Sequence, residues 1–305
     1  MNFKNTRACA AVMLGALLAG SWSAANAMEG PSVYPMGIAN FGTASVPPPG
    51  VYAIESLGHI ELDNVRNNSG NPVPAIRNFK TKLDILSTRI NWVPGTTLLG
   101  GQLVLAAVLP VAHINTTRTI GPTTVAGNKT GTLDLSMNAA LGYDLAPNWK
   151  AAVGVSLYAP TGTYNAASPA NLGKNHWAIE PMFALSYVSK EGINADITGG
   201  VIFNGRNKAT GYTSGAELHF DYALGWAFGN GWTAGLGGFA MRQLTDDKKA
   251  AREVPNFRAA AFAIGPVVKY DSGKGWIASA EYEKMTHVRN GPKGDILWLK
   301  TGFRF

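Results

Sequence analysis

The sequence predicts an all-β protein, a 12-stranded antiparallel β-barrel that spans a bacterial outer membrane. Three observations support this fold. Long segments alternate apolar and polar residues, short turn signals alternate with long polar connections, and the chain ends in an alternating strand, 295–305, that closes on Phe305. A period of two places one face of such a strand against lipid and the other against the lumen.

The first residues have the pattern of a signal peptide. A short positive stretch precedes an apolar run over 8–20, and the motif A-N-A at 25–27 supplies the small side chains that signal peptidase needs. We expect cleavage after this motif, which makes 1–27 a signal peptide and directs the protein to the outer membrane. The apolar run is shorter than the ~18 residues of a helical membrane span, so no helical anchor is expected.

Composition limits the possible partners. The formal net charge of +7 is spread along the chain without a basic block, which argues against a nucleic-acid partner. Glycine is abundant, at 36 of 305 residues, and charged residues make up only 15%. Both features fit a barrel with lipid outside, but they also fit a secreted β-sandwich, so composition alone does not decide the fold.

The clearest strand covers 217–228, where apolar side chains alternate with polar or small ones. Segments 132–145 and 193–204 repeat this pattern. These runs exceed the ~5–6 residues of a usual soluble strand and match the ~9–11 residues of a tilted membrane strand. The expected lipid-facing side chains are Leu218, Phe220, Tyr222, Leu224, Trp226 and Phe228 of this strand, with Phe303 and Phe305 of the last one.

The connections predict the number of strands. Six long external loops alternate with five short periplasmic turns, which gives twelve strands and places both barrel ends on the short-turn side. One strand, 81–93, has Asp84 on the apolar face, and a bulge would restore its register. The long loops are expected at 63–80, 115–130, 161–175, 205–214, 246–256 and 288–294, and the turns at 94–96, 146–148, 190–192, 229–231 and 272–275.

Tryptophans lie beside the short turns. Amphipathic rings favour the headgroup level of a membrane, so Trp92, Trp149, Trp232 and Trp276 are predicted to form an interfacial girdle. The alternative is that they are ordinary core aromatics near turns.

The segment 28–50 differs from the barrel region, 51–305. It contains five prolines and no alternation, so it is not expected to be a strand. It forms either a periplasmic lead-in or a partial plug that folds upward into the lumen.

The inward faces carry charges of both signs. In a narrow lumen such charges are expected to pair, because an isolated charge is costly to desolvate. They form a structural network, a solute path, or both. Twelve strands leave a lumen narrower than that of a 16-stranded porin, which suits one small solute. The candidate pore-lining residues are Glu55, His59, Asp134, Glu180, Asp196, Glu217, His219, Asp221, Glu281, Glu283, Lys300 and Arg304.

We predict no enzyme activity, no cofactor and no metal site. His219 with Glu217 or Asp221 is the nearest approach to a catalytic group, but inward spacing of two residues is routine in a barrel wall. The sequence places no serine beside them, and it has no metal-ligand spacing.

Several segments together resemble a known family. They include VPPPGVY at 46–52, NLGKNHWAIEP at 171–181, FNGRNKATGYTSGAELHFDYALGWAF at 203–228 and IGPVVKY at 264–270. They are similar to the outer-membrane family named for the MetA pathway of phenol degradation. The resemblance implies a porin-like channel for passive uptake of small hydrophobic or aromatic compounds.

The implied partners are outer-membrane lipid, a small hydrophobic or aromatic solute, and the barrel-assembly machinery, which would bind the C-terminal strand. Two alternatives remain. One is a structural or loop-mediated binding barrel with a closed lumen. The other is uptake of long-chain amphiphiles such as sphingosine, with which related members are associated.

Overall fold

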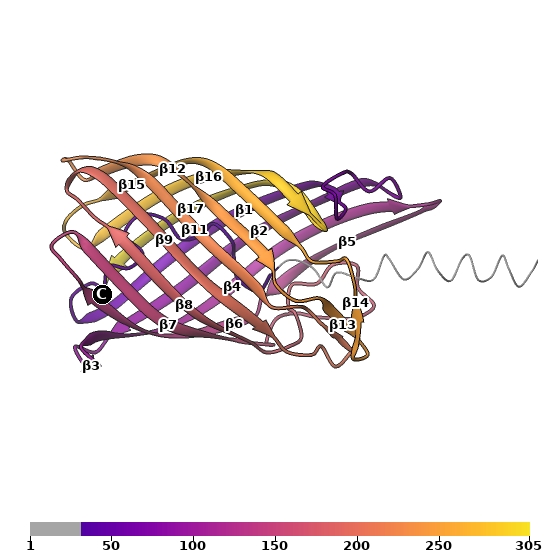
Figure 1. Cartoon of the computed structure of the whole chain (residues 1–305), viewed down its shortest axis with the longest axis horizontal. Coiled ribbons are helices and arrows are strands. Elements are labelled where there is room, and N and C mark those ends of the chain that lie inside the picture. Colours follow the sequence, from indigo (N-terminus) through magenta and orange to yellow (C-terminus); the bar gives the residue numbers. More distant parts are fainter. Residues whose placement is uncertain (1–31) are drawn as a thin grey trace, which may run out of the picture.

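A computed structural model describes residues 32–305 as a closed antiparallel barrel of 12 long strands, which confirms the predicted fold class and strand number (Figure 1). The first and last strands, β1 and β17, pair and close the wall. The signal peptide expected over 1–27 lies outside the described residues. The wall strands are β1 (Gly50–Arg66), β2 (Ile76–Val93), β4 (Gly101–Ile120), β6 (Leu135–Asp144), β7 (Trp149–Ala159), β8 (Ala178–Tyr187), β9 (Glu191–Asn204), β11 (Glu217–Phe228), β12 (Trp232–Gln243), β15 (Ala260–Asp271), β16 (Trp276–Arg289) and β17 (Gly291–Arg304).

Alternation along the strands separates an outer face from a lumen. On β11, Leu224, Trp226 and Phe228 are exposed, whereas His219 and Asp221 are buried. The residues predicted to face lipid all lie on the outer face by strand register, and their contact with lipid remains a prediction. Within residues 32–305 no helix is long and apolar enough to cross a membrane.

Aromatic residues gather at the short-turn end, where both barrel termini lie. The predicted girdle residues Trp92, Trp149, Trp232 and Trp276 are all exposed beside these turns. Three of them lie against tyrosines: Trp149 against Tyr187, with ring centroids 5.2 Å apart, and Trp232 and Trp276 on either side of Tyr270. This arrangement is the one expected of side chains at a membrane interface.

The strands extend further at the long-loop end than the sequence analysis predicted. The range 115–130, expected to be a loop, is a β-hairpin in which β4 pairs with β5 (Thr123–Thr132) and projects beyond the neighbouring strands (Figure 1). The range 288–294 is also not a loop, because β16 and β17 meet at a turn on Asn290, whose φ is 48°. β-Branched threonines favour extended backbone in the first case.

Short strands occur in some of the remaining connections. The link between β1 and β2 is reduced to residues 67–75, and 160–177 is a true loop without strands. Three two- or three-residue strands, β10 (Tyr212–Thr213), β13 (Asp247–Lys249) and β14 (Arg252–Val254), form a small sheet at the long-loop end. At the other end β3 (Thr97–Leu98) pairs with β4.

Two predicted pore-lining residues on β1 face outward, and that prediction is wrong. Glu55 and His59 share the face of exposed Leu57, whereas Ser56 on the opposite face is buried. Glu55 accepts a hydrogen bond of 2.8 Å from the outward Thr88. His59 likewise contacts a side chain of the neighbouring strand, Asp84 of β2, so the two polar residues are partnered across the outer face of the wall.

The expected bulge in β2 does not turn Asp84 inward. β2 is irregular between Arg77 and Lys80, and its pairing with β1 runs without a break past Asp84. Asp84 therefore stays on the face of exposed Leu86. Oδ1 of Asp84 lies 2.5 Å from Nδ1 of His59, so the Asp84 carboxyl group has a hydrogen-bond partner on the outer face of the wall.

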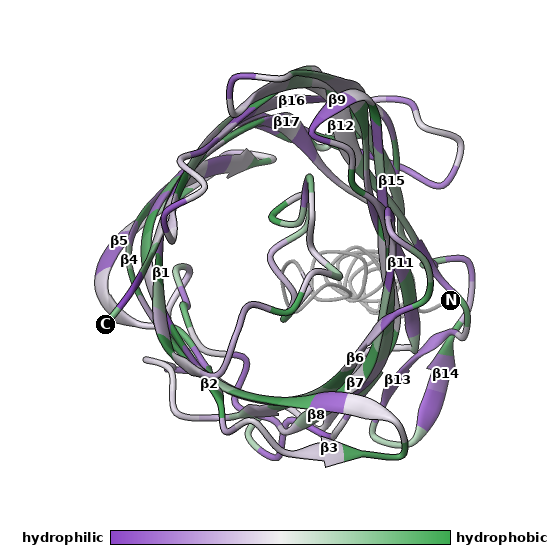
Figure 2. Cartoon of the chain, turned by 90° about the vertical axis from the view of Figure 1, so that its left-hand side faces the viewer, coloured by the Kyte–Doolittle hydropathy of each residue, from purple (hydrophilic) through white to green (hydrophobic). Residues whose placement is uncertain are grey.

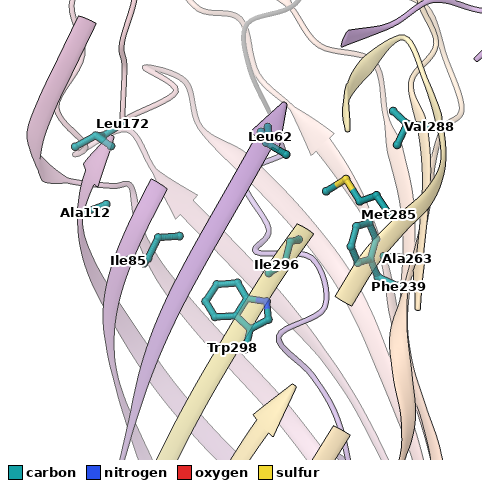
Figure 3. Close-up of a cluster of buried hydrophobic side chains, with 10 residues drawn as sticks. All are labelled: Leu62, Ile85, Ala112, Leu172, Phe239, Ala263, Met285, Val288, Ile296 and Trp298. Carbon is teal, nitrogen blue, oxygen red and sulfur yellow. The ribbon is translucent and has the colours of Figure 1, made fainter. Parts of the chain in front are cut away.

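Apolar side chains line the lumen toward the long-loop end (Figure 3). This apolar lining consists of buried residues on seven wall strands and one loop. Its largest member, Trp298, lies flat against Gly58, where an added Cβ would come within 2.3 Å of the ring. The buried members are Leu62, Ile85, Ala112, Leu172, Phe239, Ala263, Met285, Val288, Ile296 and Trp298.

The outward position of Leu224 gives a test of depth in the membrane. Leu224→Arg at mid-strand is expected to lower the free energy of unfolding by about 2–4 kcal/mol, because lipid cannot solvate the guanidinium. Leu145→Arg is the matched control, since both leucines are 61% exposed but Leu145 follows β6 at the short-turn end. There the cost is expected to be about 0–1 kcal/mol. Equal losses in refolding titrations from lipid vesicles would contradict the outward assignment.

The neighbouring Ala223 does not provide a simple lumen control. It is buried against Phe41 and Val267, so Ala223→Arg would displace the chain that occupies the lumen. We expect this variant to alter permeation through that displacement, measured as conductance in planar bilayers.

Candidate functional site

An irregular stretch of chain lies inside the ring of strands (Figure 2). We call residues 32–49 the inner segment. Its first residues, Val33 and Tyr34, pack against Tyr158 near the long-loop end. At the short-turn end Arg304 donates a hydrogen bond of 3.1 Å to the carbonyl of Pro49. The inner segment therefore runs along the lumen and leads into β1.

Asp196 on β9 holds the lower part of the inner segment. Its carboxylate accepts hydrogen bonds from the backbone N–H groups of Gly42 (2.9 Å) and Thr43 (3.0 Å) and from the Ser186 hydroxyl. The N–H of Ala44 donates to Ser186 Oγ at 3.0 Å. Successive backbone N–H groups around one carboxylate form a compact anion site, with Gly42 supplying a φ of +81°.

Asp221 on β11 holds the upper part in the same way. It accepts hydrogen bonds from the N–H groups of Gly37 and Ala39, both at 3.0 Å, and from the Tyr34 hydroxyl at 2.8 Å. Burial and the nearby Asp221 raise the pKa of Tyr34 well above its ordinary value, so its phenol stays a donor. Gly37 has a φ of +76°, and an added Cβ would lie 2.0 Å from the Glu283 carboxylate.

Strands β15 and β17 bind the carbonyl groups of the inner segment. Lys269 on β15 donates to the carbonyl of Phe41 at 3.1 Å, and Lys300 on β17 donates to the carbonyl of Ile38. The indole N–H of Trp298 donates to the carbonyl of Met36 at 3.3 Å. Carboxylates on β9 and β11 thus hold backbone donors of the inner segment, and ammonium groups on β15 and β17 hold its backbone acceptors.

A buried polar cluster surrounds the upper end of this segment. Nε2 of His219 lies 2.7 Å from Oε1 of Glu180, and the Tyr158 hydroxyl donates to Oε2 of the same carboxylate at 2.6 Å. Tyr34 stacks on the His219 ring with centroids 4.1 Å apart. Glu180 and His219 are fully buried, so the cluster is closed from bulk solvent by the inner segment.

Toward the long-loop end the lumen is chemically two-sided. Strands β8 and β11 carry Glu180 and His219 there, whereas the apolar lining lies mainly on β1, β2, β16 and β17. Nearer the short-turn end β16 and β17 also carry inward charged residues, namely Glu281, Glu283 and Lys300. Two residues of the inner segment, Met36 and Ile38, pack against the apolar lining. An apolar molecule in this part of the lumen would therefore contact apolar side chains of both the wall and the inner segment.

Most of the predicted pore-lining residues lie on the inward face, and their role in permeation remains a prediction. Asn40 of the inner segment donates to Oε2 of Glu281 at 3.0 Å. Asp134 lies between β5 and β6, where it accepts the N–H groups of Gly162 (2.9 Å) and Lys174 (2.8 Å) and fixes the 160–177 loop. The inward set comprises Glu180, Asp196, Glu217, His219, Asp221, Glu281, Glu283, Lys300 and Arg304.

Sequence reasoning missed several residues of the site. Tyr34 and Ser186 complete the two carboxylate sites, and Trp298 completes the apolar lining. The inward position of Trp298 was visible in the alternation of the last strand, but its contact with residues 36 and 58 was not. Within residues 32–305, no group of three or more His, Cys, Asp or Glu side chains is placed to hold a metal ion.

Comparisons with known proteins support the same fold. The protein family described as "Putative MetA-pathway of phenol degradation" matches residues 62–301. The crystal structure of the COG4313 outer membrane channel from Pseudomonas putida F1 is similar with a TM-score of 0.75 and 21% identity, over 87% of this chain and 98% of that chain. A comparison with curated proteins gives no match.

Two further structures are more distant. The beta domain of the Bordetella autotransporter BrkA has a TM-score of 0.49 and 13% identity, over 85% of this chain and 100% of that chain. The CymD monoaromatic hydrocarbon channel has a TM-score of 0.42 and 8% identity, over 85% and 89%.

Proposed function

This chain belongs to the family described as "Putative MetA-pathway of phenol degradation", and from that premise we propose that it is an outer-membrane channel for passive uptake of small hydrophobic or aromatic compounds. The similar structure from Pseudomonas putida F1 is that of an outer membrane channel. The family's name connects the channel to aromatic catabolism.

The observation that carries this proposal is the apolar lining inside the barrel. A lumen built for ions or sugars would present polar side chains, and burying apolar ones there gives no advantage to a hydrated solute. Here Leu62, Ile85, Met285, Ile296 and Trp298 face inward near the long-loop end. Such a surface favours an aromatic or aliphatic solute, because each Å² of apolar contact removed from water contributes ~25 cal/mol.

The inner segment limits what can pass. It fills part of the lumen and contacts the apolar lining through Met36 and Ile38. We infer that a solute moves between the inner segment and the apolar wall, so that side-chain rearrangement or displacement of the inner segment accompanies passage. Long-chain amphiphiles fit the same two-sided lumen, with the chain on the apolar wall and a polar head on the carboxylate wall.

Export and assembly follow from the same proposal. The leader 1–27 is removed, residues 28–50 contribute the inner segment, and residues 51–305 form the barrel in the outer membrane. Lipid contacts the outward apolar face. The last strand, which ends at Phe305, is the segment that the barrel-assembly machinery recognises.

Hydrolysis is not part of the proposed function. Nε2 of His219 is hydrogen-bonded to Glu180, and the Tyr34 ring stacks on one face of the imidazole. The histidine is fully buried, so a substrate could reach it only after the inner segment moves away. This arrangement suits a structural hydrogen bond better than a general base.

A methionine exchange tests the proposal. Met285→Gln places an amide of similar size in the apolar lining, and uptake of an aromatic probe should fall at least ~5-fold because the probe loses apolar contact and the amide must be desolvated. The assay measures accumulation of a radiolabelled monoaromatic compound in cells that carry the variant. Met137→Gln on the exposed outer face is the matched control and should leave uptake unchanged. Equal effects of the two variants would count against transport along the apolar lining.

A further inference from the structure

A polar pocket of about 320 Å³ opens at the long-loop end of the wall, apart from the lumen site. It lies where β12 and β16 end and β15 begins, and the connection between β12 and β15 supplies part of its lining. Three of its lining residues are arginines, Arg242, Arg258 and Arg289, and its acidic lining residue is Asp246. The pocket is therefore strongly basic.

Strand register places the pocket on the outer face. Arg242 of β12 pairs with Ala260 of β15, which pairs with Arg289 of β16, so the three form one row across the wall. This row continues the outward face of Phe262, the exposed aromatic of the next row toward the barrel middle. Ala260 lies between Arg242 and Arg289 in this row, and its small methyl side chain lines the pocket between the two guanidinium groups.

The three arginines differ in the hydrogen bonds and ion pairs that their side chains already make. Arg258 makes a two-pronged ion pair with Asp246, at 2.9 and 3.1 Å, and this guanidinium holds the pKa of Asp246 below its ordinary value. Arg289 donates to the carbonyl and side-chain oxygens of Asn68 at 2.6 and 3.0 Å. Arg242 has no ion pair or hydrogen bond from its side chain within residues 32–305.

The pocket is held in shape by Asn290 at the β16–β17 turn. Its amide donates to the carbonyls of Asn256 and Arg258, both at 3.0 Å, and to Oδ1 of Asn68 at 3.2 Å. These bonds join the 67–75 connection, the segment before β15 and the β16–β17 turn. The backbone around the pocket and two of its arginines, Arg258 and Arg289, are thus held in place, which lowers the entropy cost of binding an anion.

We propose that this pocket binds the phosphate group of an anionic glycolipid in the outer leaflet of the membrane. The inference rests on the outer-membrane placement in the proposed function. Guanidinium groups match phosphate with paired hydrogen bonds, and a net excess of two positive charges remains after Asp246 is counted. The position on the outward face, one row beyond Phe262, sets the phosphate at headgroup level while the acyl chains lie along the apolar wall.

Binding of lipid A to the refolded full barrel in detergent, measured by native mass spectrometry, tests this inference. Arg242→Ala is expected to raise the apparent Kd at least ~10-fold, because a charge-assisted pair with phosphate is lost. Arg242→Lys keeps the positive charge but loses the planar guanidinium with its paired donors, and it should give an intermediate Kd. Arg252→Ala, on β14 and outside the pocket, removes the same charge and should leave binding unchanged.

The lipid itself supplies the second arm of the experiment. Lipid A from which both phosphates have been removed should bind at least ~10-fold more weakly than intact lipid A. Unchanged binding in Arg242→Ala, or equal binding of the dephosphorylated lipid, would overturn the proposal. So would a site that takes inorganic phosphate but not lipid A. Because Arg242 is exposed and unpaired, its variants should fold, and heat-modifiable mobility in gels verifies this.

This experiment separates the lipid site from the transport function. Loss of lipid A binding in Arg242→Ala with normal uptake of aromatic probe supports the lipid site alone. Normal lipid binding in Met285→Gln with reduced uptake supports transport alone.

Discussion

Replacing Asp196 and Asp221 together with alanine is expected to release the inner segment and raise single-channel conductance at least ~3-fold. The double variant removes every carboxylate acceptor of Gly37, Ala39, Gly42 and Thr43. Hydrogen bonds to a charged group contribute about 1.5–3 kcal/mol each, so their combined loss outweighs the remaining contacts of the inner segment with the two lysines. Conductance in planar bilayers measures the result.

Two controls define the outcome. Asp63→Ala removes an exposed carboxylate near the end of β1 and should leave conductance unchanged. Deletion of residues 32–45 gives the conductance of the emptied barrel. If deletion raises the current but the double variant does not, the lysine contacts at Phe41 and Ile38 hold the inner segment in place, and the carboxylates do not.

Trp298→Ala is expected to lower the free energy of unfolding by about 3–5 kcal/mol, the cost of truncating a large buried aromatic side chain. Its ring is almost fully buried against Gly58, and its N–H group holds the carbonyl of Met36. The variant therefore leaves a cavity and an unpaired carbonyl in the lumen. Urea titrations of refolding into lipid vesicles measure the loss.

Trp92→Ala is the matched comparison for this substitution. Trp92 is a half-exposed member of the girdle, and lipid or water replaces its contacts. We expect it to lose less than half as much stability as Trp298→Ala. Comparable losses would mean that Trp298 does not serve as a packing centre. The cavity at Trp298 should also admit larger aromatic probes, which the accumulation assay can detect.

The barrel was predictable because its strands are specified locally. Every second side chain on β11 or β17 meets the same surroundings, so the pattern appears in the sequence without knowledge of distant residues. Turn residues such as Gly229 and Gly231 mark the short turns, and both have positive φ in the structure. The loop 115–130 was mispredicted because its threonines and asparagines are polar. In the structure they pair across strands, as Thr81 and Thr116 do with side-chain oxygens 2.7 Å apart.

The inward assignment of Glu55 and His59 failed for a different reason. Polarity alone predicts a lumen-facing side chain, but a polar residue also lies on the outer face where the neighbouring strand supplies a partner, as Thr88 does for Glu55. His59 lies on β1 and Asp84 on β2, and the alternation of either strand alone does not show that these two residues lie side by side. Their contact becomes apparent only once the register of β1 and β2 is known.

The candidate site could be predicted only in part. Alternation indicated that Asp196, Asp221 and Lys300 face the lumen. It could not show that they bind residues 36–45, because those contacts join positions more than 150 apart in sequence, as between Thr43 and Asp196. The inner segment has no periodic pattern of its own, so nothing local indicates where it lies.

The inner segment also constrains how the molecule can be made. Its anchors stand on β9, β11, β15 and β17, which are synthesised after it, while the seam between β1 and β17 shuts last in chain order. The inner segment is thus synthesised before the strands that enclose it. A bulky folded tag fused just ahead of Ser32 would have to cross the finished cylinder or be trapped within it, so tags are better placed in the 160–177 loop.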